Sequence, residues 1–451
     1  MTLAAVILAA GQGTRLKSSL PKVLHRLAGR PLVRYAVDAA RAVANLPPVL
    51  VIGHGAEAVR AELADSVQYA IQSEQLGTGH AVLQAADLLR GRCERVLVTY
   101  GDTPLIRPET LRALAEAQAQ NSGPITLLSI DAPRLDDFGR VVRDSQGHVT
   151  ALVEAAQCTP AQRDIPERNV GAYCFDAEWL WAHLPRLPLS PKGEYYLTDT
   201  VAQAVAEGLH VAAIKTDDEA ETLGVNTRAQ LAQAEALLRR RINEKWMAEG
   251  VTLIDPATTY IEPSVAIGRD TVIWPNTHLQ GQTVVGANCV LGPNTIVRDT
   301  CIGDDCRVEY SVLEGAWLAE EVEVGPFAHL RPGARLERGV HIGNFGEVKN
   351  STLGPGVKMG HFSYIGDAVI GAATNIGAGT ITCNYDGMRK HRTVIGENVF
   401  LGSDTMLVAP LTLGEGARTG AGAVVTKDVP AHSLAVGVPA RVIRKLKTED
   451  G

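Results

Sequence analysis

The hydrophobic pattern of the chain changes character near residue 250. Before this point, short apolar runs typical of buried strands alternate with amphipathic stretches typical of helices. The strand-like runs are 4–10, 49–52, 96–99 and 125–130, and the helix-like stretches are 32–43, 56–63, 79–89 and 108–118. This alternation predicts a mostly parallel sheet with helices on both faces, whose ligands bind at the carboxyl ends of the strands.

A different period governs the second half. An aliphatic residue recurs at every sixth position over residues 318–348, 353–365 and 395–413. Each six-residue unit predicts one short strand and one turn, and three units complete a triangular coil with the aliphatic side chain inside. Glycine also rises, from 17 residues in 1–250 to 27 in 251–451. We therefore predict a parallel β-helix.

Two connecting segments complete the organisation. Residues 227–249 form one polar–apolar stretch that Thr227 can cap and Gly250 can stop, which predicts a linker helix. The six-residue spacing fails between Ile376 and Ile395, so a loop containing residues 382–390 is expected to leave the prism. The expected parts are a domain over 1–226, a linker helix over 227–250 and a β-helix domain over 251–451.

Composition excludes several classes of protein. With 45% hydrophobic and 21% charged residues, the chain is expected to be a soluble globular protein. The net charge of −7 argues against non-specific binding to nucleic acid or acidic membranes. No early apolar run is long enough to span a bilayer or resembles a secretory signal. Seven scattered cysteines without a CxxC pair predict reduced thiols and a cytoplasmic location.

The first candidate motif is Leu8-Ala-Ala-Gly-Gln-Gly-Thr-Arg-Leu16, directly after the first apolar run. Its glycines let the backbone approach an anion, and the following amides can bind phosphate. It is not a dinucleotide fingerprint, because Leu16 stands where the third glycine would be, and it is not a Walker loop. Taken alone, the motif leaves a purely structural turn and a phosphate site both open.

Its surroundings resemble the signature of sugar-nucleotide pyrophosphorylases. Arg15 is followed by Pro21-Lys22, as in their GxGTRL…PK pattern. Further matches follow in order: Gln72 with Gln75–His80, Tyr100-Gly-Asp102, Gly139 with Glu154 and Asn169, and Gly224-Val-Asn226. The resemblance implies a Rossmann-like nucleotidyltransferase domain. Val170 stands where the family usually has threonine.

Nucleotidyl transfer suits these residue types. The nucleophile is an ionised phosphate, so the reaction needs charge neutralisation and in-line alignment rather than a general base. We expect Arg15 and Lys22 to supply the positive charge, and Asp102 with Asn226 to hold Mg²⁺. The resemblance implies that UTP and the UDP-sugar product contact Leu8, Gly11, Gly13, Lys22, Gln72, Gly77, Thr78, Tyr100, Gly139, Glu154, Asn169 and Asn226. Among these, it implies that Gln72, Gly77 and Thr78 lie against the uracil and ribose, and that Gly139, Glu154 and Asn169 bind the N-acetylated sugar.

Four stretches of the second half resemble hexapeptide acetyltransferases, and together with the first half they resemble the bacterial bifunctional uridyltransferase–acetyltransferases. They are 331–333, 343–349, 360–366 and 375–387. The implied fold is a left-handed parallel β-helix. The implied general base is His361, with Glu347 as its orienting partner, because an imidazole titrates near neutral pH.

The same resemblance assigns the remaining residues of this half. Glucosamine-1-phosphate is expected to contact Arg331, Lys349, Tyr364, Asn375, Asn384 and Lys390. Acetyl-CoA is expected to contact Ala378, Asn384, Tyr385, Ser403, Ala421 and Arg441, and Arg444 and Lys445 are further candidates for its 3′-phosphate. The resemblance also implies a homotrimer in which the extruded loop reaches a neighbouring subunit.

These features favour a bifunctional enzyme that acetylates glucosamine-1-phosphate and then transfers UMP from UTP to N-acetylglucosamine-1-phosphate for cell-envelope synthesis. One alternative is a single-function nucleotidyltransferase with a regulatory β-helix, which would not need the set His361, Lys349, Tyr364 and Asn384. Another is a non-catalytic scaffold, against which Arg15, Lys22 and Asp102 argue.

Overall fold

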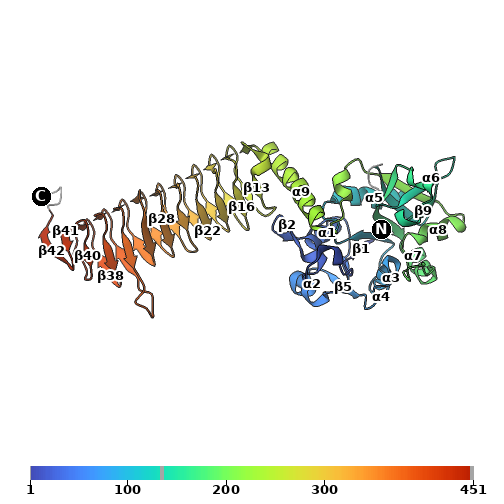
Figure 1. Ribbon diagram of the computed structural model, residues 1–451, viewed down its shortest axis with the longest axis horizontal. Coiled ribbons are helices and arrows are strands. Elements are labelled where there is room, and N and C mark those ends of the chain that lie inside the picture. The colour runs from blue at the N-terminus through green and yellow to red at the C-terminus, as the bar shows by residue number, and fades with distance from the viewer. Residues whose placement is uncertain (1, 133–136, 447–451) are drawn as a thin grey trace. The chain divides into compact units, whose positions relative to one another are not determined.

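The computed structural model describes residues 2–132 and 137–446. The chain folds into two compact units, Met1–Leu238 and Arg239–Gly451 (Figure 1). No helix in the described ranges combines the length and the apolar character that crossing a membrane requires. All seven cysteines, which lie within these ranges, have free thiols.

A mixed sheet forms the centre of the first unit. Its main path runs β11 (Val211–Lys215), β7 (Ile125–Asp131), β10 (Glu167–Asp176), β6 (Arg95–Tyr100), β1 (Leu3–Leu8), β4 (Val49–Ile52) and β5 (Gln68–Ile71). The four strands predicted from apolar runs are confirmed as β1, β4, β6 and β7. The mostly parallel prediction missed β10, which runs antiparallel to both β6 and β7. It also missed the hairpin of β8 (Arg140–Arg143) and β9 (Val149–Val153).

Helices cover both faces of this sheet, as predicted. Along β1, Ala4, Val6 and Leu8 belong to one buried cluster and Leu3, Ala5 and Ile7 to the other, because side chains alternate along a strand. The second cluster is covered by α1 (Leu32–Arg41), α2 (Ala56–Leu63) and α5 (Pro108–Gln120). The first is covered by α3 (Thr78–Leu83), α4 (Ala86–Leu89), α7 (Ala177–His183) and α8 (Asp199–Ala206). The helix predicted over 79–89 is therefore two short helices.

The predicted linker helix is present as α9 (Arg228–Ala248). Thr227 caps it: its hydroxyl accepts from the Gln230 amide at 3.2 Å, while the Gln230 side chain accepts from the Thr227 amide at 3.0 Å. Ala234 packs in a small cluster of the first unit, and Trp246 packs in the core of the second. This one helix therefore contributes to both cores.

The second unit is the predicted parallel β-helix. Its strands form three parallel sheets, and successive strands of one coil belong to different sheets, as in β27 (His341–Ile342), β28 (Gly346–Lys349) and β29 (Thr352–Leu353). The aliphatic column predicted at six-residue spacing is buried inside: Leu318, Val324, Leu330, Leu336, Ile342 and Val348. The last coil is closed by the antiparallel hairpin of β41 (Ser433–Gly437) and β42 (Ala440–Lys445).

One corner of the prism carries an exposed aromatic column. Tyr310, Phe327, Phe345 and Phe362 follow one another on successive coils, and Phe345 is 60% exposed. Phe327 stacks on Phe345 with ring centroids 5.5 Å apart. The first three residues have positive φ angles of 47–61°, a conformation that bulky side chains rarely adopt. Four aromatic side chains therefore face outward where small turn residues are usual.

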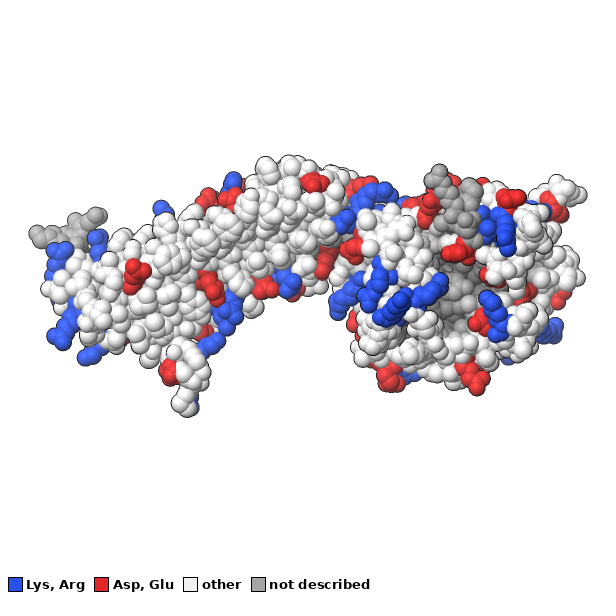
Figure 2. All heavy atoms as spheres, viewed as in Figure 1, with Lys and Arg blue, Asp and Glu red and all other residues white. Residues whose placement is uncertain are grey.

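The expected loop leaves the prism between β34 (Ile381–Cys383) and β35 (Thr393–Ile395). It is visible as an orange-red protrusion in Figure 1, and Figure 2 shows the same protrusion with both acidic and basic side chains. Tyr385 and Lys390 form an isolated antiparallel bridge at its base. The ladder continues past it, because Asn375 of β33 (Asn375–Ile376) pairs with Phe400 of β36 (Phe400–Leu401).

Candidate functional sites

A cavity of about 310 Å³ opens at the carboxyl ends of β1 and β6. This is the edge of the sheet at which the sequence predicts ligand binding. The cavity brings together eight predicted site residues from five segments of the chain: Leu8, Gly11, Lys22, Gln72, Gly77, Thr78, Tyr100 and Asp102. Glu194 and Tyr196 also line it, although no sequence pattern singled them out.

Four predicted polar residues meet beside this cavity. The Lys22 ammonium contacts the Asp102 carboxylate directly and donates to Asn226 Oδ1 at 3.1 Å. Arg15 donates to the same amide oxygen at 2.9 Å. The Val225 amide donates to the Asp102 carbonyl at 2.8 Å, which holds the segment before α9 against the end of β6. Residues more than two hundred positions apart thus form one charged cluster.

The donor set of this cluster fits a magnesium ion. Asp102 and Asn226 turn their oxygens toward one point, where the Lys22 ammonium now supplies the positive charge. A carboxylate and an amide oxygen are hard ligands, and Mg²⁺ usually takes one or two carboxylates together with phosphate oxygens and water. The described residues contain no group of three His, Cys, Asp or Glu side chains suited to a metal ion. Any ion at this point therefore depends on substrate phosphates for much of its coordination.

The backbone that forms this cavity has two positions where only glycine fits. Gly13 has φ 63°, and a Cβ there would lie 2.5 Å from the Lys22 Cβ. Gly77 has φ 100°, and a Cβ there would lie 2.6 Å from the Tyr195 carbonyl oxygen. The side chain of Gln72, which is 3% exposed, donates to the Gly77 carbonyl at 3.1 Å. The segment around Gly77 is thus fixed from both sides.

The side chain of Tyr100 lines the first cavity. Burial raises the pKa of Tyr100 far above its usual value, and the nearby charges of Glu154 and Asp102 raise this pKa further. The phenol is therefore neutral at physiological pH. In this form it offers a bound substrate one hydroxyl donor without adding negative charge beside the phosphates.

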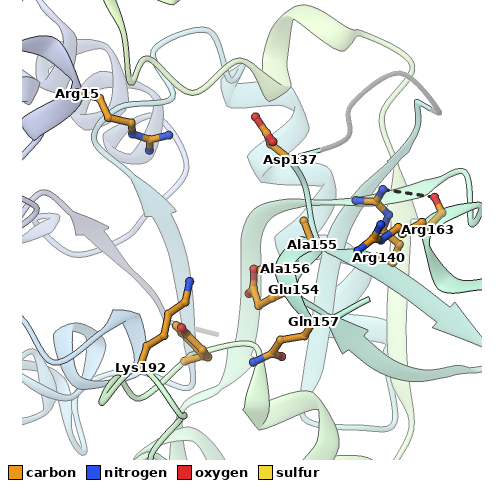
Figure 3. Close-up of a pocket in the computed structure, with 10 residues that line it drawn as sticks. Arg15, Asp137, Arg140, Glu154, Ala155, Ala156, Gln157, Arg163 and Lys192 are labelled. Atoms are coloured by element: carbon orange, nitrogen blue, oxygen red, sulfur yellow. Dashed lines mark hydrogen bonds between the residues drawn. The ribbon is translucent and has the colours of Figure 1, made fainter. Parts of the chain in front are cut away.

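A second cavity lies next to the first and is lined by charged side chains (Figure 3). Its lining is Arg15, Asp137, Arg140, Glu154, Ala155, Ala156, Gln157, Arg163, Lys192 and Tyr196. Tyr196 lines both cavities. The Arg15 guanidinium and the Lys192 ammonium point toward the same open space in Figure 3. Arg15 therefore connects the phosphate motif with this second cavity.

The three residues predicted to bind the sugar lie together beside this cavity. The Asn169 amide donates to the Gly139 carbonyl at 2.9 Å, and a Cβ on Gly139 would lie 3.9 Å from the Glu154 Cα. Glu154 Oε1 accepts from the Thr198 hydroxyl at 3.1 Å. Asn169 donates to the Tyr173 hydroxyl at 2.7 Å. Sequence analysis missed Thr198, because a lone threonine in a loop carries no pattern.

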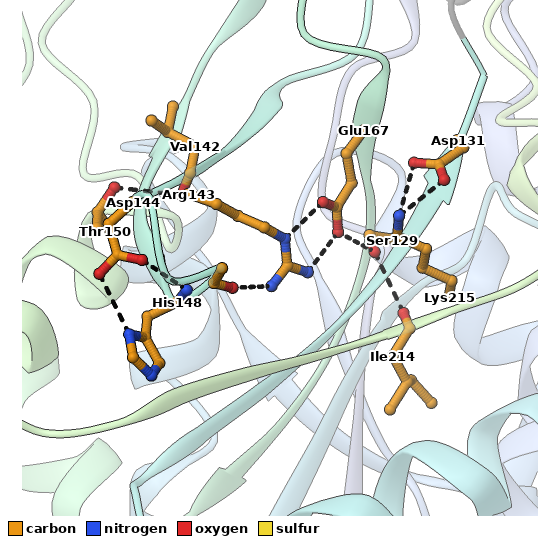
Figure 4. Close-up of polar contacts among 11 residues, drawn as sticks. Ser129, Asp131, Val142, Arg143, Asp144, His148, Thr150, Glu167, Ile214 and Lys215 are labelled. Carbon is orange, nitrogen blue, oxygen red and sulfur yellow. Dashed lines mark hydrogen bonds and ion pairs between the residues drawn. The ribbon is translucent and has the colours of Figure 1, made fainter.

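A partly buried ion-pair network supports the strand that carries Asn169 (Figure 4). Arg143 donates to both carboxylate oxygens of Glu167 at 2.7 Å, and the Ser129 hydroxyl donates to Glu167 Oε1 at 2.7 Å. Burial alone would raise the pKa of Glu167, but the hydrogen bonds from Arg143 and Ser129 outweigh it and lower this pKa. The network ties β7, β8 and β10 together.

The second unit gathers a different set of predicted residues on one of its three sheets. His329, Glu347 and Tyr364 occupy equivalent positions on successive coils. Arg331 donates to Glu347 Oε1 at 2.8 Å. Lys390, together with Arg331, lowers the pKa of Lys349, because like charges lie close together. The three basic residues predicted to bind a sugar phosphate thus belong to one positive cluster.

Asn384 packs against its own prism. Its side chain donates to Asp367 Oδ2 at 2.5 Å. A Cβ on Gly366 would lie 2.3 Å from the Tyr364 hydroxyl and 2.8 Å from Asn384 Nδ2. Tyr364 and Asn384 therefore meet over this glycine within one chain. The expectation that the extruded loop reaches a neighbouring subunit stays a prediction, because this contact lies within one chain.

His361 begins a second column on the prism. His361 follows a glycine, and Ala378, Ser403 and Ala421 also each follow a glycine in their own coils. The pairing of Lys358 with Asn375, of Asn375 with Phe400 and of Phe400 with Arg418 places these four residues at one corner of successive coils. The predicted base thus shares a corner with the residues predicted to contact acetyl-CoA.

The predicted partner of His361 is engaged elsewhere. Glu347 forms an ion pair with Arg331, and no hydrogen bond to the His361 ring occurs within the described part of the chain. Tyr385 lies in the loop and donates to the Gly387 carbonyl at 2.6 Å. Arg441 is exposed on β42, opposite Val436. Within this chain, Glu347 therefore contacts Arg331 rather than the His361 ring.

Comparison with known proteins finds a transferase family in each half of the chain. The model of the MobA-like NTP transferase domain matches residues 5–186, and the model of the bacterial transferase hexapeptide matches residues 264–299 and 392–427. Proteins called "Bifunctional protein GlmU" are similar over nearly the whole chain. Those of Heliobacterium modesticaldum, Pelobacter propionicus and Stutzerimonas stutzeri are 48%, 47% and 49% identical, over 96%, 98% and 97% of this chain and 94%, 97% and 96% of theirs.

Similarity at this level and coverage extends across the nucleotidyltransferase unit, the linker helix and the hexapeptide unit. It agrees with a cavity that gathers the nucleotidyltransferase motifs and with a β-helix that gathers the acyltransferase motifs. A regulatory β-helix and a non-catalytic scaffold do not account for both observations. The chain belongs to the GlmU family of bifunctional proteins, and it carries a nucleotidyltransferase and an acyltransferase in one polypeptide.

Proposed function

We propose that the two units catalyse consecutive reactions. The β-helix unit transfers the acetyl group of acetyl-CoA to glucosamine-1-phosphate. The first unit then transfers UMP from UTP to N-acetylglucosamine-1-phosphate and releases pyrophosphate. The observation that carries the proposal is the convergence of Arg15, Lys22, Asp102 and Asn226 beside one cavity. A cytoplasmic location and the domain limits at 226 and 250 stay predictions.

In the first unit, positioning and charge account for the uridyl transfer. Arg15 and Lys22 neutralise the triphosphate while the sugar phosphate attacks the α-phosphorus. Asp102 and Asn226 would hold a Mg²⁺ ion, which would supply further charge stabilisation to the phosphates. Gln72, Gly77 and Thr78 accommodate the base and ribose, and the second cavity accommodates the sugar. The linings of the two cavities support these roles for Arg15, Lys22, Asp102, Gln72, Gly77 and Thr78.

In the β-helix unit, His361 takes a proton from the sugar amine as the amine nitrogen attacks the thioester carbonyl. Collapse of the tetrahedral intermediate breaks the carbon–sulfur bond and releases CoA. Arg331, Lys349 and Lys390 hold the sugar phosphate, and Tyr364, Asn375 and Asn384 bind its hydroxyl groups. Backbone amides along the corner of Ala378, Ser403 and Ala421 lie along the acetyl-CoA and stabilise the oxyanion.

A homotrimer forms part of the proposal. The aromatic column of Tyr310, Phe327, Phe345 and Phe362 supports it, because contiguous exposed rings on a soluble protein mark an interface. Sedimentation of the full chain tests this assignment: a trimer is expected, and a monomer would contradict it. Phe345→Ser together with Phe327→Ser should shift the equilibrium toward smaller species.

An end-point assay tests both activities at once. The full chain receives UTP, acetyl-CoA, glucosamine-1-phosphate and Mg²⁺, and the readouts are UDP-N-acetylglucosamine and free thiol. Both products are expected. UDP-sugar formed only when N-acetylglucosamine-1-phosphate is supplied, without thiol release, would instead support a single-function nucleotidyltransferase.

A further inference from the structure

The second cavity contains a cation that neither reaction has used so far. Lys192 lines this cavity together with Arg15 and Glu154. Figure 3 shows its ammonium rising from a loop on one wall, while the Arg15 guanidinium enters from another. Lys192 forms no ion pair or side-chain hydrogen bond with any residue in the described ranges. Its charge is therefore available to a ligand.

The loop that carries Lys192 is well defined. The Ser190 amide donates to the Glu194 carbonyl at 2.9 Å. The Ser190 hydroxyl also accepts from the Glu194 amide at 3.1 Å, and Gly193 closes the turn with φ 77°. Lys192 thus projects from a closed turn, which limits the entropy lost when its side chain binds an anion.

The base of this loop connects the two cavities. The Tyr195 amide donates to the Leu76 carbonyl at 2.8 Å, and the Leu197 amide donates to the Thr78 hydroxyl at 2.9 Å. On the other side, Thr198 donates to Glu154. The turn is therefore anchored both to the segment expected to bind the nucleotide and to the carboxylate expected to bind the sugar.

The anion that fits between Arg15 and Lys192 is the phosphate of the sugar substrate. The sugar occupies the second cavity, and its phosphate must face the α-phosphate held in the first. Arg15 and Tyr196 mark this boundary, because Arg15 bonds Asn226 beside the first cavity and Tyr196 lines both. An ammonium on the opposite wall would complete a two-sided clamp on a phosphate dianion.

We propose that Lys192 binds the phosphate of the sugar-1-phosphate during uridyl transfer and thereby determines its affinity. This assignment rests on the proposed function. Because the ammonium contacts the phosphate before and during the reaction, it contributes mostly uniform binding, which changes KM more than kcat. Variants with a neutral, a negative or a positive side chain at position 192 distinguish this role from that of a solvated surface lysine.

Steady-state kinetics of Lys192→Gln, Lys192→Glu and Lys192→Arg in the full chain tests the inference. Lys192→Gln should raise KM for N-acetylglucosamine-1-phosphate about 10-fold, the usual worth of a charged hydrogen bond. Lys192→Glu should raise it further, and Lys192→Arg should restore most of the affinity. KM for UTP and the rate of acetyl transfer should stay within about 2-fold of those of the unaltered chain.

Lys245→Gln is the matched control, because it removes the same charge from an exposed position on α9. An unchanged sugar-phosphate KM in Lys192→Gln would overturn the inference, and so would an equal rise in KM for UTP, since the contact would then be with the triphosphate. Absence of uridyl transfer in the unaltered chain would instead refute the proposed function. The two failures are therefore distinguishable.

Discussion

Lys22 and Asp102 are in direct contact at the edge of the sheet, although 80 residues separate them in the sequence. Asn226 accepts a hydrogen bond from the same ammonium. This arrangement keeps a positive charge at the point where Asp102 and Asn226 would bind a cation. For a cation to bind there, Lys22 would have to release these oxygens, and its charge would then be free for the phosphates.

The first prediction concerns this exchange. Asp102→Asn removes the one full negative charge of the expected metal site, so uridyl transfer should fall by about 10²-fold or more. Acetyl transfer should be unchanged, because the β-helix unit does not use this residue. A titration with Mg²⁺ at fixed UTP provides the measurement. If uridyl transfer survives the substitution at every Mg²⁺ concentration, Asp102 is not the ligand.

The second prediction concerns where the chain can be divided. A fragment of residues 1–250 should transfer UMP to N-acetylglucosamine-1-phosphate, because it keeps the cluster around Ala234. A fragment of residues 1–226 should be unstable and inactive. It loses Gln230, whose side chain accepts from the Asn226 amide at 2.9 Å, and Glu235, which accepts from the Ala28 amide at 2.7 Å.

Thermal melting and uridyl-transfer assays of the two fragments measure this difference. Exposure of Trp246 on the longer fragment is expected, because its partners lie in the β-helix core. Equal stability and activity in both fragments would show that α9 contributes nothing to the first unit. Loss of activity in a folded 1–250 fragment would contradict the assignment of a complete uridyl site to this unit.

The third prediction concerns acetyl transfer. His361→Ala should reduce it by about 10²–10⁴-fold, the range expected for a positioned general base, and should leave uridyl transfer intact. Glu347→Gln is the comparison, because Glu347 binds Arg331 rather than His361. This variant should raise KM for glucosamine-1-phosphate and leave the pH profile of kcat unchanged. A shifted profile would show that Glu347 acts on the base.

The fourth prediction concerns stability and pH. The pKa of Glu167 is lowered in the folded chain, so its network stabilises the first unit above the ordinary carboxyl pKa. This contribution is lost as pH falls below about 4.5 and the carboxylate becomes protonated. Glu167→Gln should lower the free energy of unfolding by about 1.5 kcal/mol at pH 7, because Arg143 and Ser129 lose hydrogen bonds to a charged acceptor.

Urea unfolding of the first unit at pH 7 and at about pH 3.5 measures this effect. The difference between the variant and the unaltered chain should shrink at the lower pH, because Glu167 of the unfolded chain is then protonated and the stabilisation decreases as pH falls toward the lowered pKa of the folded chain. A difference that is constant with pH would show that packing, rather than charge, accounts for the loss. Ser129→Ala should follow the same trend with a smaller amplitude.

Sequence patterns predicted most of the architecture, because the decisive signals were local. The six-residue spacing from Leu318 to Val348 corresponds directly to a buried column, and Thr227 caps the helix that it was expected to begin. The antiparallel direction of β10 was not predicted, because the sequence of a buried strand does not indicate which way the strand runs. The break between α3 and α4 was not predicted, because the apolar residues continue across it.

For the sites, motifs predicted which residues matter but not which ones meet. Lys22 and Asp102 were assigned to separate roles, and only the fold brings them into contact. Glu347 was paired with His361 through the family resemblance, whereas the register of β28 brings it to Arg331. Lys192 was missed because a lysine in a loop has no pattern until the fold places it in a cavity.

The loop between β34 and β35 affects how the sequence of this protein can evolve. Its coil is longer than its neighbours, yet Ile381 still pairs with Met406 and Thr393 with Leu411 on the following coil. Insertions at this corner therefore leave the hydrogen-bonded ladders intact. A lineage can lengthen, shorten or replace the segment that carries Tyr385 and Lys390 while the prism beneath it keeps its register, so substrate contacts and scaffold can evolve at different rates.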